Sequence, residues 1–297
     1  MPELPEVETV RAGLAQFLVG QKILSAESTW EKSFPNDPKL VRDKVVEATV
    51  LSVDRRGKAI IVPLSSSYSL LIHLKMTCQL VYRPSTGKGF GGGHPNDSLI
   101  HNLPDTSTRV IITLTNGTLF FNDQRKFGYV KLEKTAGLYE RNLFLRKLGP
   151  EPLEENYTFE QFKTAVQKHR KTSIKAAILD QTVVAGVGNI YADEGLFAAK
   201  VHPATKVSQV STVKLHRLFD ALREVMQLSI KLGGSSDRNY VDAKGKKGSY
   251  LKFAKVFRRE GKECPVCGSE VTKIRVAGRG THVCPKCQKL KNNVKTN

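Results

Sequence analysis

Four cysteines near the end of the chain restrict its fold more than any other feature. They form two Cys-x2-Cys pairs, Cys264 with Cys267 and Cys284 with Cys287, with sixteen residues between the pairs. This spacing is typical of a tetrahedral Zn²⁺ site with four thiolate ligands, and the intervening span is long enough for a β-hairpin. All four ligand positions are filled, so the sequence predicts one structural Zn²⁺. It would contribute on the order of 10 kcal/mol to folding a module too small for its own core.

Length and charge restrict the domain count and the partners. The 297 residues fit two domains and a small third module. A formal net charge of +19 at neutral pH indicates a surface that attracts polyanions, so nucleic acid is the expected partner. We find no signal peptide and no run of about 18 apolar residues, so we expect no membrane span. The cysteine pairs then indicate metal in a reducing cytoplasm.

The first nine residues, MPELPEVET, place two prolines and three acids at a terminus. Pro5 suits the first turn of a helix, where acids are also favoured. Apolar residues recur at helical spacing as far as Leu18, and Gly20 marks the expected end. We interpret the terminus as anchored by this helix. Our hypothesis is that removal of Met1 exposes Pro2 as a secondary amine that acts as a nucleophile, with Glu3 beside it as an acid.

Short β-favouring runs from about Lys44 to Glu133 predict an antiparallel sandwich or barrel. The predicted strands are 45–46, 50–51, 60–62, 70–72, 80–81, 110–112 and 119–121. Turns are expected at 55–58, at 115–117 and around Asp123. The glycine-bearing stretch from Pro84 to Asp105 is expected to be a flexible surface loop.

The chain after residues 149–152 (GPEP) is expected to be helical. Thr158 and Gln161 form a capping box, and further helices are expected at about 173–180, 190–199 and 208–232. The turn 186–189 (GVGN) precedes a helix, and its backbone N–H groups can hold a phosphate. Arg279, between two glycines at the expected hairpin tip, can approach another phosphate closely.

These motifs together resemble the formamidopyrimidine-DNA glycosylase family of bifunctional repair enzymes. They are PELPEVET, the RRGK turn, HLxM, the DxRxFG turn, GVGNIYADE and the four-cysteine finger, in the family's order over nearly the whole chain. The implied fold is α+β and multidomain: an N-terminal antiparallel β-sandwich flanked by helices, then a helical helix-two-turn-helix domain with a zinc finger. The expected domains are 1–134 (catalytic sandwich), 135–149 (linker), 150–234 (helix-two-turn-helix), 235–255 (lesion-covering loop and connection) and 256–290 (zinc finger).

The resemblance also implies catalytic roles. Pro2 forms a Schiff base at C1′ of the damaged nucleotide, and Glu3 is the general acid that assists sugar opening. Lys58 is a proton donor near the scission site. A terminal amine has a pKa near 8, well below the roughly 10.4 of lysine, so more of it is unprotonated at neutral pH. The resulting iminium acidifies the sugar's C2′ hydrogen, which explains strand cleavage by β- then δ-elimination without a metal or organic cofactor.

Further roles implied by the resemblance concern DNA binding. Met76, Arg125 and Phe127 fill the void left by the flipped nucleotide, with Arg125 facing the orphaned cytosine. Phosphate contacts and other DNA contacts are implied for Asn189, Arg279, Arg170 and Lys175, and Arg279 is also linked to the elimination. Three places depart from the family pattern: the long 87–93 region, Ser107 where a histidine is usual (with His101 as a substitute), and 250–252 in the lesion loop.

The expected function is therefore removal of oxidised purines, 8-oxoguanine and formamidopyrimidine, from duplex DNA, followed by nicking of the strand. We expect a monomer in the cytoplasm, associated with the nucleoid, acting on DNA with oxidised bases or abasic sites. One alternative is an endonuclease VIII-like glycosylase for oxidised pyrimidines, against which Leu4 and the DQRKFG turn argue. Another is a non-catalytic zinc-ribbon DNA-binding protein, against which the intact Pro2, Glu3 and Lys58 argue.

Overall fold

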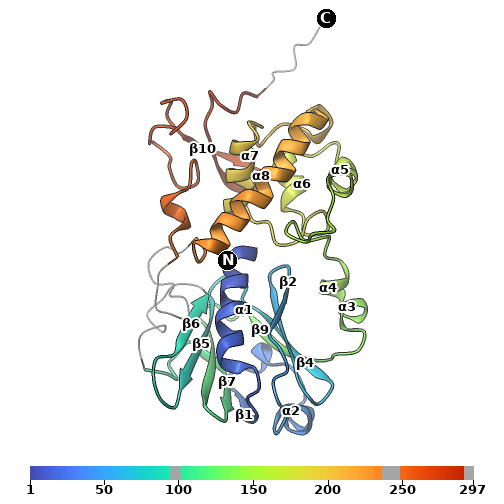
Figure 1. The fold of residues 1–297 in the computed structure, drawn as a ribbon, viewed down its shortest axis with the longest axis vertical. Coiled ribbons are helices and arrows are strands. Elements are labelled where there is room, and N and C mark those ends of the chain that lie inside the picture. Colours follow the sequence, from blue (N-terminus) through green and yellow to red (C-terminus); the bar gives the residue numbers. More distant parts are fainter. Residues whose placement is uncertain (94–101, 236–247, 291–297) are drawn as a thin grey trace, which may run out of the picture. The chain divides into compact units, whose positions relative to one another are not determined.

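The chain forms two compact units. The computed structural model describes residues 1–93, 102–235 and 248–290 (Figure 1). The first unit contains Met1–Arg146 and Ser229–Tyr250, and the second contains Lys147–Leu228 and Leu251–Asn297. Most of the expected lesion-covering loop, 236–247, and His101 lie outside the described residues.

Helix α1, Leu4–Leu18, begins where the proline and acid signals predicted. Pro5 lies in its first turn, and Glu6 closes a capping box with Glu3. Val7, Val10 and Leu14 are completely buried, as their helical spacing requires for one face packed on a core. The end of the chain is therefore held in place instead of fraying.

Two antiparallel sheets complete the core of the first unit. The five-stranded sheet has the order β1-β7-β8-β5-β6, and the four-stranded sheet has the order β2-β3-β4-β9. Their strands are β1 (Ile23–Ser28), β2 (Asp54–Arg56), β3 (Ala59–Pro63), β4 (Tyr68–His73), β5 (Cys78–Pro84), β6 (Phe90–Gly93), β7 (Thr108–Leu114), β8 (Gly117–Asp123) and β9 (Tyr129–Lys134). One buried cluster combines Leu14 of α1, Ile72 of β4 and Leu80 of β5, which confirms the expected sandwich.

The glycine-rich stretch predicted as a loop contains a strand, so that prediction was wrong for β6. Leu80 of β5 pairs with Gly92 of β6. A Cβ atom on Gly93 would lie 2.4 Å from the carbonyl oxygen of Cys78, and one on Gly13 of α1 would lie 2.3 Å from the Phe90 ring. Because glycine has no side chain, the backbones can pack this closely, and this packing outweighs the low strand propensity of glycine.

A second correction concerns Val45–Val46, predicted as a strand. Val45 ends helix α2, Pro38–Val45. The Asp37 side chain caps this helix by accepting hydrogen bonds from the N–H groups of Lys39 and Leu40, and Pro38 occupies its first turn. These capping signals at the start of α2 outweigh the strand preference of the two β-branched residues at its end.

The segment 135–149, expected to be a linker, contains two short helices, α3 (Leu138–Arg141) and α4 (Leu143–Arg146). The described residues also contain the short 3-10 helices η1 (Glu31–Ser33), η3 (Val207–Gln209) and η4 (Tyr250–Lys252). Ser229–Lys231, the last turn of α8 (Thr212–Lys231), belongs to the first unit, and the rest of α8 belongs to the second.

The second unit is helical and ends in a hairpin. Its helices besides α8 are α5 (Phe159–Gln167), α6 (Ile174–Leu179) and α7 (Asn189–Ala198), and its strands are β10 (Thr272–Val276) and β11 (Arg279–Val283). The capping box of Thr158 and Gln161 is present at the start of α5, as predicted. The zinc-finger cysteines flank the hairpin, and a small buried cluster joins Cys264 and Cys284 to Val271 and to Phe197 of α7.

Within the described parts of the chain, no helix combines the length and the apolar character that crossing a membrane requires.

Candidate functional site

The start of α1 is a buried, hydrogen-bonded site. Pro2 is buried, and Glu3 is only 5% exposed. One oxygen of the Glu6 carboxylate accepts the Glu3 N–H at 3.0 Å, and its other oxygen accepts the Ser235 N–H at 2.8 Å. Glu6 therefore ties the first residues of the chain to Ser235, four positions beyond the end of α8.

Charged groups converge on the terminal amine, which in this structure belongs to Met1. Burial lowers the pKa of this amine below its ordinary value of 8.0. The charges of Glu3 and Glu6 raise the pKa of the amine, and the charge of Lys58 lowers it. The structure thus brings the predicted residues Pro2, Glu3 and Lys58 together. The Pro2 nitrogen is a peptide nitrogen while Met1 is attached, so Met1 must be removed before Pro2 can act as an amine.

Lys58 is placed by a tight turn between β2 and β3. It follows Gly57, whose φ of 58° lies in the left-handed region that glycine adopts without strain. Lys58 is only 6% exposed, which is unusual for a lysine.

An ion-pair network fastens the RRGK turn to α1. Arg55 Nε donates to Glu8 Oε2 at 2.9 Å, and an Arg11 guanidinium nitrogen lies 2.7 Å from Glu8 Oε1. Burial alone would raise the pKa of Glu8, but the hydrogen bonds from Arg11 and Arg55 outweigh it and hold the pKa below its usual range. The sequence reasoning did not identify this function of Glu8, although its place in the first turns of α1 and the arginine pair in the RRGK motif were visible.

The three predicted void-filling residues are all exposed. Met76 lies in the turn between β4 and β5 and is 41% exposed, and Phe127 lies in the turn after β8 and is 55% exposed. The Arg125 guanidinium carbon lies 5.0 Å from the centre of the Phe127 ring. Large apolar side chains displayed in this way are available to contact a partner, as an insertion role requires.

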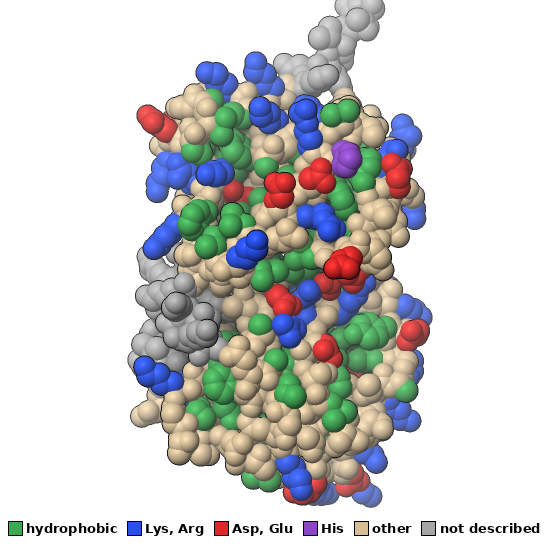
Figure 2. All heavy atoms as spheres, viewed as in Figure 1, with side chains coloured by type: hydrophobic (Ala, Val, Ile, Leu, Met, Phe, Trp, Pro, Cys, Tyr) green, Lys and Arg blue, Asp and Glu red, His purple; other side chains and the backbone are tan. Residues whose placement is uncertain are grey.

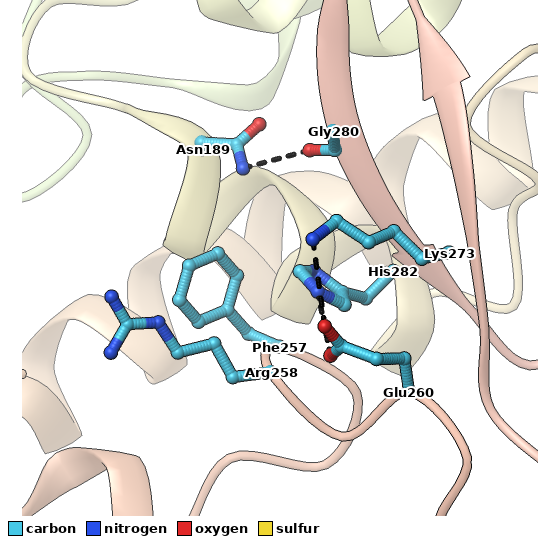
Figure 3. Close-up of a pocket in the computed structure, with 7 residues that line it drawn as sticks. All are labelled: Asn189, Phe257, Arg258, Glu260, Lys273, Gly280 and His282. Atoms are coloured by element: carbon cyan, nitrogen blue, oxygen red, sulfur yellow. Dashed lines mark hydrogen bonds and ion pairs between the residues drawn. The ribbon is translucent and has the colours of Figure 1, made fainter.

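In the second unit, Asn189 and Arg279 lie on neighbouring elements. Asn189 begins α7, directly after Gly188, and its side-chain nitrogen donates to the carbonyl oxygen of Gly280 at 3.0 Å (Figure 3). Arg279 begins β11 and is exposed. A hollow of about 440 Å³ adjoins this contact, and its lining is Asn189, Phe257, Arg258, Glu260, Lys273, Gly280 and His282. The helix N-terminus with nearby basic side chains suits a phosphate.

The two acids of the GVGNIYADE motif bind α7 to the zinc finger. Asp193 accepts the N–H of His282 at 2.9 Å, and it is completely buried. Glu194 accepts three backbone N–H groups, those of residues 255, 256 and 257. Burial raises the pKa of Glu194 despite these bonds, which lower it. The sequence reasoning missed these contacts, since adjacent acids on a helix usually face solvent.

Lys175, predicted to contact DNA, has no exposed surface. Its ammonium group lies 2.6 Å from Asp193 Oδ1 and donates to Thr281 Oγ1 at 2.7 Å. A direct DNA contact would require these bonds to open. Arg170, by contrast, is exposed. Ser107, the departure from the family pattern, is 6% exposed and donates from its N–H to Asp105 Oδ1 at 2.7 Å.

The four cysteines fit a structural zinc ion. Their sulfur atoms all lie within 4.8 Å of one another. The Cys267 and Cys284 sulfurs are 3.5 Å apart, and those of Cys264 and Cys287 are 3.9 Å apart. A tetrahedral ion with Zn–S bonds of about 2.3 Å places its sulfur ligands roughly 3.8 Å apart. The arrangement therefore suits one Zn²⁺ with four thiolate ligands.

Basic side chains are spread over the surface, in keeping with the net charge. Figure 2 shows Lys and Arg side chains on each unit of the face it draws, interspersed with fewer acidic ones. Such a surface attracts a polyanion from a distance, and the residues described above would make the specific contacts once it is bound.

Three family models match successive parts of the chain. The formamidopyrimidine-DNA glycosylase N-terminal domain matches residues 1–130, and the H2TH domain of the same family matches residues 148–240. A zinc finger found in FPG and IleRS matches residues 261–290. The matches follow the order of the two units and the finger.

Full-length relatives share this organisation. The chain is 40% identical over 294 residues to the formamidopyrimidine-DNA glycosylase of Pelotomaculum thermopropionicum, covering 98% of this chain and 100% of the relative. It is 39% identical over 290 residues to that of Streptococcus pyogenes, covering 97% and 99%.

The fold is also that of solved relatives. A Lactococcus lactis FPG mutant in complex with DNA containing Fapy-dG superposes with a TM-score of 0.85 at 36% identity, covering 97% of this chain and 100% of that chain. The Lactococcus lactis Fpg complex with abasic-site DNA also gives 0.85, at 35% identity and the same coverage. With its N-terminal site, its α7 and its four-cysteine finger all in place, the chain belongs to the formamidopyrimidine-DNA glycosylase family.

Proposed function

We propose that this protein is a bifunctional DNA glycosylase and AP lyase that removes oxidised purines, 8-oxoguanine and formamidopyrimidine, from duplex DNA. The observation that carries the proposal is the convergence of the charges of Glu3, Glu6 and Lys58 on the start of the chain, where Pro2 and Glu3 are buried and the Met1 amine is partly buried. A neutral secondary amine in a buried site is suited to attack an electrophilic carbon.

The reaction begins after Met1 is removed. The Pro2 nitrogen attacks C1′ of the damaged nucleotide and the bond to the base breaks. The base leaves with the electron pair and takes up the proton that the Pro2 nitrogen loses. Glu3 donates a proton to the sugar ring oxygen as the ring opens, and the nitrogen and C1′ then form an iminium. Burial of Glu3 excludes water from this proton transfer.

Strand cleavage follows from the iminium. Its positive charge acidifies C2′, and loss of a C2′ proton expels the 3′ phosphate by β-elimination. A second elimination expels the 5′ phosphate. Lys58 is the proton donor placed beside the scission site, and Arg279 holds a flanking phosphate and assists the elimination. Hydrolysis of the iminium by water then releases the Pro2 amine and the sugar remnant as an aldehyde.

DNA binding combines insertion and phosphate contacts. Met76, Arg125 and Phe127 enter the duplex and occupy the space of the flipped nucleotide, with Arg125 facing the orphaned cytosine. Asn189, Arg279 and Arg170 contact phosphates. Lys175 supports this interface indirectly. Its buried side chain bonds to Thr281 and Asp193 and so holds the hairpin that carries Arg279.

The partner is duplex DNA with oxidised bases or abasic sites, bound by one copy of the chain. Support comes from the solved relatives, whose DNA contains Fapy-dG or an abasic site. We place the protein in the cytoplasm with the nucleoid, because four thiolate ligands to zinc need a reducing compartment.

Borohydride trapping tests the proposal. Protein lacking Met1 is incubated with a duplex carrying 8-oxoguanine opposite cytosine, and the reduced adduct is digested and identified by mass spectrometry. We expect an adduct on Pro2, and none with protein that retains Met1. A duplex with an oxidised pyrimidine is the matched control. Faster trapping on that control would favour the endonuclease VIII-like alternative, and no trapping on either would leave only a DNA-binding protein.

A further inference from the structure

We propose that Asp123 is a positioning residue that fixes Met76, Arg125 and Phe127 as one insertion unit by joining the two turns that carry them. This inference rests on the proposed function, since it explains how the insertion residues keep the arrangement that void filling requires.

Asp123 lies where the two turns meet. It is the last residue of β8 and has no exposed surface. Its register partner across the sheet is Cys78, the first residue of β5. Met76 precedes β5 by two positions, and Arg125 and Phe127 lie two and four positions after the end of β8. One buried carboxylate is therefore at the base of both turns.

The Asp123 carboxylate bonds to both turns. Oδ1 accepts the Thr77 hydroxyl at 2.5 Å and the Arg125 N–H at 3.1 Å, and Oδ2 accepts the Gly128 N–H at 2.8 Å. Thr77 is the neighbour of Met76, and its hydroxyl oxygen also accepts the Arg125 N–H at 3.2 Å. These bonds reach the residues adjoining Met76 and Phe127 and the backbone of Arg125 itself.

The backbone of both turns needs such support. Lys75 and Lys126 have φ angles of 45° and 57°, in the left-handed region that residues other than glycine rarely adopt. Such conformations persist where the surrounding structure imposes them, and they are frequent at ligand-binding sites. Each strained residue is adjacent to an insertion residue, so the strain lies where the bonds of Asp123 can offset it.

The ionised state of Asp123 strengthens these bonds. Burial alone would raise the pKa of its carboxyl, but the hydrogen bonds from Thr77, Gly128, Cys78 and Arg125 outweigh it and hold the pKa below the usual range. Hydrogen bonds to a charged acceptor are stronger than neutral ones. Burial, and to a smaller extent the charge of Asp123, raises the pKa of the Cys78 thiol.

Close packing adds to the rigidity of the second turn. A Cβ atom on Gly128 would lie 2.0 Å from the Cys78 sulfur and 2.8 Å from the Phe121 ring. Glycine at this position thus lets the turn lie directly on β5. The insertion side chains remain exposed, while the backbone beneath them is fixed.

A rigid insertion unit matters because flipping a nucleotide out of a duplex costs on the order of a few kcal/mol. If the insertion residues were disordered before binding, the entropy cost of ordering them would offset part of the free energy that they supply on entering the DNA. Replacing Asp123 should therefore reduce base flipping, and should leave a substrate that needs no flipping largely unaffected.

The test uses Asp123→Asn and Thr77→Val, which preserve shape and remove hydrogen bonds, with Phe127→Ala as the reference for lost insertion. Excision is measured on a duplex with 8-oxoguanine opposite cytosine, and flipping is followed by the fluorescence of a 2-aminopurine next to the lesion. We expect Asp123→Asn to slow duplex excision and lower the fluorescence change by roughly tenfold, the effect of one lost charge-assisted bond. Cleavage of a single-stranded abasic site should change less than about twofold, because no base is flipped.

The double variant Asp123→Asn/Phe127→Ala separates positioning from general stability. If Asp123 acts through the insertion unit, the loss of the double variant on the duplex should be clearly smaller than the combined losses of Asp123→Asn and Phe127→Ala, because both changes impair the same step. Additive losses, or an equal loss on single-stranded abasic DNA, would overturn the proposal. Thr77→Val, which leaves the carboxylate in place, carries the same test if Asp123→Asn fails to fold. Absence of trapping by the wild-type protein would instead refute the proposed function, so the two failures are distinguishable.

Discussion

The Lys175 ammonium lies 2.6 Å from the Asp193 carboxylate in a site where neither side chain has any exposed surface. Burying two charges is costly, and only their pairing and further hydrogen bonds compensate for it. Here Thr281 and the backbone of β11 supply these further bonds. The pair therefore joins α6 and α7 to the hairpin of the zinc finger.

We predict that Lys175→Met destabilises the second unit by about 3–5 kcal/mol, because it leaves the Asp193 charge buried without its cation. Urea unfolding followed by circular dichroism measures this change. Arg170→Met, at an exposed position, is the matched control and should change stability by less than about 0.5 kcal/mol. Normal stability of Lys175→Met together with weakened DNA binding would instead identify Lys175 as a direct DNA contact.

His73 should make the stability of the first unit dependent on pH. Burial, aided by the charges of Lys75 and Lys58, lowers the pKa of His73 from 6.5 to about 3. In the folded chain its Nδ1 accepts the Lys75 N–H at 3.0 Å, which requires the neutral ring. Below pH 6.5 His73 binds a proton in the unfolded chain but stays neutral in the folded chain. The free energy of unfolding therefore falls as the pH is lowered towards 3.

The slope should be about 1.4 kcal/mol per pH unit below the unfolded pKa and absent above it. Denaturant unfolding at several pH values compares wild type with His73→Gln, which should lack this contribution. An unchanged slope in the variant would assign the acid sensitivity to other groups.

Zinc removal should unfold the finger. We expect one Zn²⁺ per chain, and its chelation should abolish tight DNA binding because the hairpin with Arg279 loses its cross-link. Atomic absorption gives the metal content, and fluorescence anisotropy gives DNA affinity. Cys284→Ser should lose the metal, whereas Cys78→Ala, outside the four-cysteine cluster, should retain it. Metal retained by Cys284→Ser would argue against a four-thiolate site.

Arg279 should contribute one phosphate contact. Arg279→Ala is expected to weaken binding to all duplex sequences and to reduce the slope of log affinity against log salt by roughly one unit. Lys22→Ala serves as the control, because Lys22 is paired with Glu47 at 2.9 Å and is not expected to contact DNA. An unchanged slope for Arg279→Ala would remove it from the set of phosphate contacts.

Glu6 should tune the terminal amine. Its charge raises the pKa of the Met1 amine, and the same charge is expected to act on the Pro2 amine once Met1 is removed. Glu6→Gln is therefore expected to lower the pKa of the Pro2 amine and to shift the pH midpoint of borohydride trapping downwards. Trap yield against pH, with protein lacking Met1, measures this shift. A midpoint that moves upwards would show that Glu6 acts mainly through its hydrogen bonds.

The elements that could be predicted from the sequence are those with local signals. Pro5 and the apolar spacing identified α1, and Thr158 with Gln161 identified the start of α5. The four cysteines identified the zinc site by spacing alone. Each of these rests on residues close together in the chain, where periodicity and capping determine structure.

The missed elements depend on contacts between distant residues. Strand β6 exists because Gly93 can approach the backbone of Cys78, and Gly13 leaves room for Phe90. Lys175 could be assigned a place in the family pattern, but its pairing with Asp193 spans two helices and has no local signature. No local pattern indicates that Asp123 joins the turns of Met76 and Phe127, because Thr77 lies 46 positions before it.

The two bonds of Glu6 have a consequence for communication along the chain. Ser235 is 229 positions away from Glu6, yet both the N–H of Ser235 and that of Glu3 depend on the same carboxylate. Ser235, which follows α8 by four positions, is thus held next to the start of α1. Loss of the Glu6 carboxylate would therefore remove the hydrogen bonds of the Glu3 N–H and the Ser235 N–H together, so one substitution would loosen two segments that are far apart in the sequence.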